Sequence, residues 1–292
     1  MATRDRRRYD AAVQLIVRSP SAAFERAIST HPERERIDPR RALAQHRDFC
    51  AALRRAGLTL VELPPEPDLP DAPFVSDVLV ALPHARTPDA QTALLVATRP
   101  GEPARRPEVS SVVECARRLV RPGTPESRIL EPGTLDAGDV LVFGDRLAIG
   151  VSARTNRCGA AQLAVAAAAL GYRVALCPVT DRLHLATAVT AVGTARLIGT
   201  PAGFASLDAA EPVAGPSSTA AEWLADVRRI VVRAEDLPAA NVLAAGGTCF
   251  MVAGHPEAAA ALRRAGERVL ELELDEFVRA DGGPTCLVAP VP

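Results

Sequence analysis

The side chains in this sequence best suited to covalent catalysis are a cysteine, a histidine and aspartates in three short segments. In ADGGPTCLVAPV (280–291), two glycines and a proline predict a tight turn that presents Thr285 and Cys286 at the start of an apolar strand. A thiol held by a rigid turn is a candidate nucleophile if a neighbouring group lowers its pKa or pairs with it. Taken alone, the pattern also fits a buried strand cysteine.

Two other segments place polar residues where a purely structural chain would not need them. In DRLHLATAVT (181–190), His184 lies between two leucines in a predicted apolar strand, as either an acid–base group or a core histidine. In LEPGTLDAGDVLVFG (130–144), Asp136 and Asp139 lie in a glycine-rich turn that leads into a strand. Carboxylates there hold a cation or bond their own backbone as turn formers, and the segment alone leaves both readings open.

A repeated supersecondary pattern supplies the scaffold for these side chains. An apolar strand is followed by an amphipathic helix and a second apolar strand. The first copy has a strand at 12–20, a helix over 37–57 with Asp38 as N-cap, and a strand at 58–63. Later copies are predicted around strands at 92–101, 145–156, 195–200 and 247–256, and the Pro-rich stretches 66–73 and 210–218 are predicted to be loops. This recurrence favours one pseudo-symmetric α/β domain.

The composition excludes several classes of function. The chain has 292 residues, 48% of them hydrophobic and 24% charged, with a net charge of −1, so it has no bias towards nucleic acid or anionic membranes. It contains no signal peptide pattern and no apolar run of about 18 residues, so we expect no membrane span. The six cysteines are scattered without CxxC pairs, which is typical of reduced thiols in a cytoplasmic protein. The other histidines lack metal-ligand spacing.

Eight segments spread along the chain resemble the dimethylarginine dimethylaminohydrolase family of the guanidino-group-modifying, or pentein, superfamily. They are FERAISTHPER (24–34), LPDAPFVSDV (69–78), TRPGEPARRPE (98–108), TLDAGDVL (134–141), GVSARTNRCGA (150–160), LHLATAVT (183–190), AANVLAAGGT (239–248) and DGGPTC (281–286). The resemblance implies a single-domain five-bladed α/β propeller of ββαβ modules over residues 1–292, with 1–10 as a flexible N-terminus. This fold agrees with the repeat.

The resemblance also implies roles for individual residues. Cys286 matches the nucleophile of the family's Asp-Gly-Gly-x-x-Cys end, and His184 matches the catalytic histidine of its Leu-His-Leu strand. Asp136 matches an acidic residue that helps to bind the guanidinium and to position the histidine. The implied reaction hydrolyses an Nω-substituted L-arginine to citrulline and an amine through a covalent cysteine intermediate, without a metal or organic cofactor.

Further residues match the family's substrate contacts. Asp77 and Asp71 belong to the loop that faces the guanidinium, Arg105 and Arg154 fall at two arginines that grip the substrate carboxylate, and Asp281 matches an acidic residue near the amino group. The implied partner is therefore a small arginine derivative, and a homodimer stays open.

One position departs from the family pattern. The family's Glu-Asp pair reads Ser76-Asp77 here, so one negative charge at the guanidinium is missing. This change bears on the substrate more than on the reaction class. The alternatives are a guanidino enzyme with another arginine derivative as substrate, an amidinotransferase, and a non-catalytic pentein that binds a partner.

Overall fold

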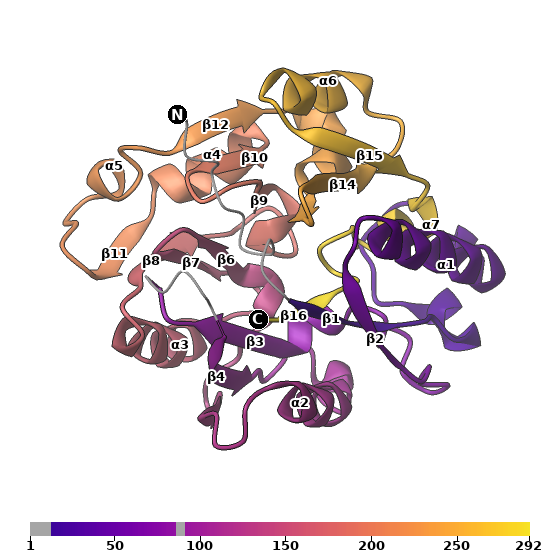
Figure 1. Cartoon of the computed structure of the whole chain (residues 1–292), viewed down its shortest axis with the longest axis horizontal. Helices are drawn as coiled ribbons and strands as arrows, with labels where there is room; N and C mark the ends of the chain where they lie inside the picture. The colour runs from indigo at the N-terminus through magenta and orange to yellow at the C-terminus, as the bar shows by residue number, and fades with distance from the viewer. Residues whose placement is uncertain (1–12, 86–90) are drawn as a thin grey trace.

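Five small β-sheets form the frame of the protein, and strands from the two ends of the chain share one of them. The computed structural model describes residues 13–85 and 91–292 (Figure 1). In sheet order, the strands are β16 (Ala289–Val291), β1 (Gln14–Arg18) and β2 (Thr59–Leu63); β3 (Leu79–Pro83), β4 (Thr92–Ala97) and β5 (Glu126–Arg128); β6 (Val140–Phe143), β7 (Arg146–Val151), β8 (Arg173–Pro178) and β11 (Glu211–Ala214); β9 (Val189–Ala191), β10 (Arg196–Gly199) and β12 (Arg228–Val231); and β13 (Leu243–Ala245), β14 (Thr248–Val252) and β15 (Arg268–Leu272).

Each sheet is built in the same way around its middle strand. The middle strand pairs antiparallel with a first strand and parallel with a last strand, as β7 does with β6 and β8. A parallel pair needs a crossover connection, which a helix supplies here. The crossover helices are α1 (Pro39–Arg55), α2 (Glu108–Leu119), α3 (Arg157–Ala169), α4 (Pro201–Asp208) with α5 (Ala220–Trp223), and α6 (Pro256–Arg264). The expected propeller of five ββαβ modules is therefore confirmed.

The ring closes because the last strand of the chain serves the first module. β16 pairs antiparallel with β1, with Gln14 opposite Val291, and takes the place that a first strand has in the other modules. First strands also contact one another, β16 with β3, β6 with β9, and β9 with β13. Figure 1 shows β16, β3, β6 and β9 towards the centre, with α1, α2, α3 and α6 on the outside. Segments before the first strands therefore meet near the middle.

Helix starts and buried faces follow from the sequence. The Asp38 carboxylate accepts hydrogen bonds from the backbone N–H groups of Arg40 and Arg41, which caps α1 as expected. Phe49 and Leu53 of α1 pack in one core cluster with Leu15 of β1. A helix that presents apolar residues three to four positions apart buries this stripe against the sheet.

The structure corrects three local expectations. His184 does not lie in a strand, since it is the N-cap of the 3-10 helix η6 (Leu185–Thr187), and β9 begins only at Val189. Cys286 lies in a turn before β16, not in the strand itself, and its N–H donates to the carbonyl of Gly283. The stretch 210–218 is not all loop, because β11 pairs with β8. β11 is the edge strand of its sheet, and an edge strand tolerates a proline such as Pro212.

Two remaining expectations concern the N-terminus and membrane-spanning helices. The proposed flexible N-terminus at 1–10 lies outside the described residues. Within the described ranges, none of the helices is both long and apolar enough to cross a bilayer.

Candidate active site

Every module contributes a polar side chain from the short segment that precedes its first strand. These are Asp77 in η3 (Val75–Val78), Asp136 and Asp139 around η5 (Ala137–Asp139), His184 before η6, Asn241 after η7 (Ala234–Ala240), and Cys286 before β16. Because the first strands meet near the centre, these side chains, which are far apart in the sequence, come together there. One cavity is lined by Asp71, Phe74, Asp77, Arg105, Arg154, His184, Asp281 and Cys286, together with Ile28, Leu183, Ala280 and Gly282.

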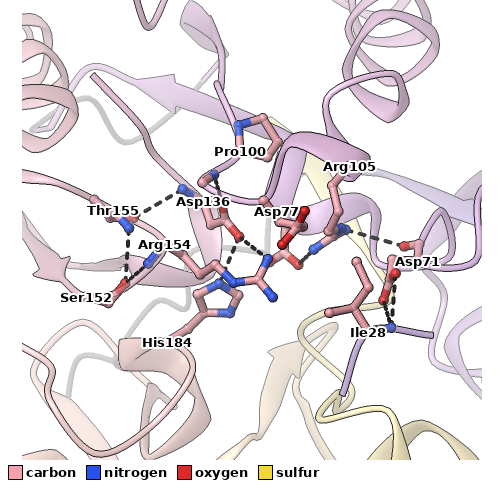
Figure 2. Close-up of polar contacts among 12 residues, drawn as sticks. Ile28, Asp71, Asp77, Pro100, Arg105, Asp136, Ser152, Arg154, Thr155 and His184 are labelled. Carbon is pink, nitrogen blue, oxygen red and sulfur yellow. Dashed lines mark hydrogen bonds and ion pairs between the residues drawn. The ribbon is translucent and has the colours of Figure 1, made fainter. Parts of the chain in front are cut away.

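Asp136 and His184 form the central hydrogen-bonded pair. His184 Nε2 lies 3.1 Å from Asp136 Oδ2, and both side chains are buried (Figure 2). The other carboxylate oxygen of Asp136 accepts a 2.8 Å hydrogen bond from the N–H of Gly101. The backbone N–H of Asp136 donates to Thr155 Oγ1 at 3.1 Å. These bonds fix the carboxylate, and the carboxylate fixes the imidazole.

Asp139 holds the segment that carries the histidine. Its Oδ1 accepts a 2.9 Å bond from the N–H of Leu185, and its Oδ2 accepts a 2.7 Å bond from the hydroxyl of Ser152. The N–H of Leu185 is thus used by a carboxylate rather than by a strand partner, which explains why His184 is not in a strand. Gly138 lies close by, since a Cβ built there would be 2.6 Å from His184 Nδ1 and 2.9 Å from Asp77 Oδ1.

The carboxylates set the protonation of His184. Burial alone would lower its pKa, but the hydrogen bond to Asp136 and the charges of Asp77, Asp139 and Asp136 raise the pKa to about 9. Burial likewise acts to raise the pKa of Asp136, but His184 and Arg105 hold that pKa below its usual value. At neutral pH the pair is therefore an imidazolium and a carboxylate.

Cys286 lines the same cavity, and its thiol is protonated at neutral pH. Burial, and next the charge of Asp77, raise the pKa of Cys286 to about 11, while the Gly283 and Thr285 hydrogen bonds and Arg105 act in the opposite direction. The carbonyl of Cys286 accepts a 3.3 Å bond from the N–H of Ser76. Without a further positive charge, the thiol needs strongly alkaline pH to ionise.

Arg105 is placed differently from the other candidate arginine. Its side chain is 5% exposed and donates to Asp77 Oδ2 at 2.6 Å and to both carboxylate oxygens of Glu108, at 3.2 and 2.8 Å. It also reaches the carbonyls of Asp71 and Phe74, both at 3.3 Å. Most of its donors are thus occupied by the protein, although Arg105 lines the cavity.

Arg154 has more freedom. Its side chain is 15% exposed, and its Nη1 lies 3.9 Å from Asp136 Oδ2 (Figure 2). Its backbone N–H is held by the hydroxyl of Ser152 at 3.0 Å. Of the two arginines, Arg154 is the one with donors available to a ligand anion.

Two further candidate residues, Asp71 and Asp281, anchor the segment around residues 28–30. Both oxygens of Asp71 lie 3.2 Å from the N–H of Ile28, and burial raises the pKa of Asp71. Asp281 Oδ2 accepts bonds from the N–H and the hydroxyl of Thr30, at 2.6 and 2.9 Å. Asp281 has φ of 56°, which a non-glycine residue adopts rarely. The structure thus closes one wall of the cavity with these residues.

Ser76 takes a neighbouring position. Its hydroxyl lies 3.5 Å from Asp77 Oδ1, and its backbone bonds to the nucleophile segment. A longer acidic side chain at this position would lie beside Asp77, which would add a second negative charge next to the first.

Sequence reasoning missed three residues that build the site. For Asp139 the sequence left a cation-binding role and a turn-forming role open and indicated no contact with the His184 segment, and neither Glu108 nor Asn241 was given a role. A signal was available for Asn241, because it lies two residues before a strand, as Asp77 does. In the described ranges, 13–85 and 91–292, no cluster of three His, Cys, Asp or Glu side chains is arranged to hold a metal ion.

The chain is similar to dimethylarginine dimethylaminohydrolases from two bacteria. It is 34% identical to the Streptomyces coelicolor protein over 276 residues, covering 93% of this chain and 94% of that protein. It is 30% identical to the Pseudomonas aeruginosa protein over 273 residues, covering 94% and 97%. A solved structure of the Pseudomonas aeruginosa enzyme, a cysteine-to-serine mutant complexed with citrulline, has a TM-score of 0.80 at 28% identity, covering 95% of this chain and 98% of that chain. No protein-family model matches the chain.

Proposed function

The chain belongs to the dimethylarginine dimethylaminohydrolase family, and we propose that it hydrolyses the guanidinium group of an Nω-substituted L-arginine to L-citrulline and an amine. The observation that carries this proposal is the cavity itself, where a cysteine thiol, an imidazolium and several carboxylates face one another. Three carboxylates, those of Asp71, Asp77 and Asp281, line the cavity and can accept charge-assisted hydrogen bonds from a cationic ligand. One domain, closed by the sheet that β1 shares with β16, is the unit that we propose for this activity.

Substrate binding supplies the charge that the thiol lacks. A guanidinium that donates to Asp77 and Asp136 forms charge-assisted hydrogen bonds in its own plane. Its positive charge lies close to Cys286 and lowers the pKa of the thiol from about 11, because an opposite charge within a few Å favours the ionised form. The nucleophile is therefore activated mainly when the correct substrate is present.

The thiolate then attacks the guanidinium carbon, which gives a tetrahedral intermediate. His184, protonated at neutral pH, donates its proton to the departing amine nitrogen, and the C–N bond breaks. This leaves an S-alkylthiouronium on Cys286 and a neutral His184. His184 next takes a proton from water, whose oxygen attacks the same carbon. The C–S bond then breaks, the hydroxyl proton of this second intermediate passes to the departing thiolate, and citrulline is released.

Three other residues that line the cavity are available to the amino-acid end of the substrate, namely Arg154, Asp71 and Asp281. We assign the α-carboxylate to Arg154, with Arg105 acting mainly through Asp77, and the α-amino group to the region of Asp71 and Asp281. This binding energy holds the reacting carbon at attack distance from Cys286.

The direct test is a substrate panel of arginine, monomethylarginine, dimethylarginine and hydroxyarginine. The proposal expects citrulline and the matching free amine in equal amounts, with no added acceptor. Ornithine formation that depends on an added amine acceptor would instead identify an amidinotransferase. Absence of turnover on all four, together with tight binding of one, would favour a non-catalytic binding protein.

The Ser76 hydroxyl favours a second candidate, a related arginine derivative as the preferred substrate. A hydrogen bond to a charged group contributes about 1.5–3 kcal/mol, so a substrate that needs two acids loses about 10- to 200-fold here. We therefore expect Ser76→Glu to raise kcat/KM for dimethylarginine and to lower it for the preferred substrate. If Ser76→Glu depressed turnover of every guanidine in the panel, the pocket would be built differently at this position.

A further inference from the structure

We propose that Asn241 is a positioning residue for the nucleophile. Its side-chain amide holds the turn that carries Cys286, joins that turn to the segment after His184, and donates towards the Cys286 sulfur. The proposal rests on the function proposed above, in which Cys286 attacks as a thiolate. It gives the fifth module a part in the site, through the residue that stands where Asp77 stands in its own module.

The oxygen of the Asn241 amide holds the nucleophile turn. Asn241 Oδ1 accepts two hydrogen bonds from Thr285, one from the backbone N–H and one from the hydroxyl, both at 3.0 Å. Thr285 directly precedes Cys286, whose N–H closes the turn on the carbonyl of Gly283. Displacement of the amide would therefore move the backbone from which the thiol projects.

The nitrogen of the same amide faces the reacting groups. Asn241 Nδ2 lies 3.8 Å from Cys286 Sγ and 3.4 Å from the carbonyl of Ala186, in the helical turn that follows His184. The partners fix which amide atom points where, because Thr285 N–H only donates and the Ala186 carbonyl only accepts. A flipped amide would oppose donor to donor and acceptor to acceptor. The nitrogen is thus the atom directed at the sulfur.

The backbone of Asn241 is itself held in place. The buried hydroxyl of Thr190 in β9 donates to the carbonyl of Ala240 at 2.7 Å and accepts from the N–H of Val242 at 3.0 Å. These two bonds clamp the residues on both sides of Asn241. On the opposite side, a Cβ built at Gly283 would lie 2.6 Å from Asn241 Cγ, so the turn approaches the amide as closely as a glycine allows.

The charges near the thiol explain what a neutral donor achieves here. The charged and titratable side chains that line the cavity with Cys286 are Asp71, Asp77, Arg105, Arg154, His184 and Asp281. Asp77 opposes ionisation of the thiol, and Arg105 favours it. An amide N–H stabilises a thiolate without adding a charge that would repel the guanidinium. A carboxylate at position 241 would oppose the thiolate instead.

The test compares three variants of the full-length protein without substrate. Asn241→Asp keeps the acceptor for Thr285, removes the donor and adds a negative charge, whereas Asn241→Ala removes both polar atoms. The control is Asn156→Asp, because Asn156 makes similar bonds at the start of α3, with Oδ1 bound to the N–H groups of Thr134 and Gly159. Alkylation of the Cys286 peptide by iodoacetamide is followed from pH 7 to 10.5 by mass spectrometry, since the exposed Cys158 also reacts.

We expect the alkylation profile of Asn241→Asp to move upwards by about one pH unit or more, which is a rate about tenfold lower at a fixed pH. Asn241→Ala should move the profile in the same direction by less, and Asn156→Asp should leave it unchanged. In both Asn241 variants kcat should fall with little change in KM, because the amide does not touch the substrate.

A wild-type alkylation profile in a folded Asn241→Asp variant would overturn the proposal. If Asn241→Asp does not fold, the same profile in Asn241→Ala decides the question. A lower Tm with faster alkylation at every pH would also overturn it, since this result marks a purely structural role. Lack of citrulline release by the wild-type protein would instead count against the proposed function, because the thiol comparison needs no substrate.

Discussion

In the described part of the chain, two histidines are buried close to a cysteine or in one cavity with it, and their surroundings give these histidines opposite charge states. His46 and Cys50 lie one helical turn apart in α1, with the sulfur 3.7 Å from His46 Nδ1. His184 and Cys286 come from different modules and line one cavity. Both histidines are almost inaccessible, 1% and 5% exposed, so burial does not distinguish them.

The pair in α1 shows what burial does alone. Burial lowers the pKa of His46 to about 4 and raises the pKa of Cys50 to about 12, with smaller effects from Glu62 and Arg54. Both groups are therefore neutral at physiological pH. A neutral thiol beside a neutral imidazole is a poor nucleophile, and we interpret this pair as part of the core of the first module.

The cavity pair differs because carboxylates surround it. Asp136, Asp77 and Asp139 overcome the effect of burial and raise the pKa of His184 to about 9. In the proposed mechanism, His184 gives this proton to the leaving amine. Under the proposed function, the carboxylates buried with His184 distinguish the cavity pair from the α1 pair, and the proximity of a cysteine to a histidine does not.

The largest effect is expected when the nucleophile is removed. Cys286→Ser should reduce turnover by at least about a thousandfold, because a serine hydroxyl is far less ionised than a thiol. Cys50→Ser should leave kcat unchanged and cost about 1–3 kcal/mol of stability, the cost of a buried polar group without a good partner. Citrulline release and urea unfolding measure both. Wild-type turnover by a folded Cys286→Ser variant would remove Cys286 from the mechanism.

The next effect concerns the acid–base group. His184→Gln should slow turnover by about 10²- to 10⁴-fold, since glutamine neither protonates the amine nor activates water. Covalent capture of the substrate carbon on Cys286 should still be detectable by intact-protein mass spectrometry. His46→Gln is the matched control and should keep normal kinetics. Near-normal citrulline release by His184→Gln would show that the two histidines do not differ in function.

A third substitution should lower the pKa of His184, so that its charge state becomes more like that of His46. Asp136→Asn removes the hydrogen-bonded carboxylate, so the pKa of His184 should fall from about 9 by about one to three units. The ring titration of His184, followed by NMR, measures this shift. Asp236→Asn is the control. Asp236 Oδ1 lies 2.8 Å from His255 Nδ1, and neither residue lines the cavity. An unmoved His184 titration in Asp136→Asn would assign the high pKa to other groups.

The sequence predicted the fold well because the repeat is local. Strand–helix–strand units and the Asp38 cap depend on neighbouring residues, and these elements formed close to the expected positions. The strand assignment of Cys286 failed locally, because its N–H bonds to the carbonyl of Gly283. The strand assignment of His184 failed for a non-local reason. The N–H of Leu185 bonds to Asp139, a residue 46 positions away, and no pattern around His184 indicates this partner.

The site was predictable as a set of residues but not as a network. Resemblance brought Cys286, His184 and Asp136 together, and the structure places all three in or directly behind one cavity. It could not indicate that Arg105 would be held by Asp77 and Glu108, nor that Asn241 would contact the nucleophile turn. Such contacts depend on how the modules meet at the centre.

The two histidines should also affect stability at opposite ends of the pH range. The folded-state pKa of His184 is raised from 6.5 to about 9, so its contribution to stability is full below pH 6.5 and is lost as pH rises towards 9. The folded-state pKa of His46 is lowered to about 4, so the folded state loses stability as pH falls from 6.5 towards 4. Each window covers on the order of 3 kcal/mol, at about 1.4 kcal/mol per pKa unit.

Urea unfolding of the wild type and the two glutamine variants between pH 4.5 and 9.5 tests these windows. His184→Gln should flatten the alkaline limb of the stability curve, because the wild-type His184 loses its ion pair with Asp136 when it deprotonates and glutamine does not titrate. The acid limb should still slope in this variant. His46→Gln should flatten the acid limb alone, because an uncharged amide removes the cost of protonating a buried imidazole. If both variants flattened the same limb, carboxylates would not be what separates the two pairs.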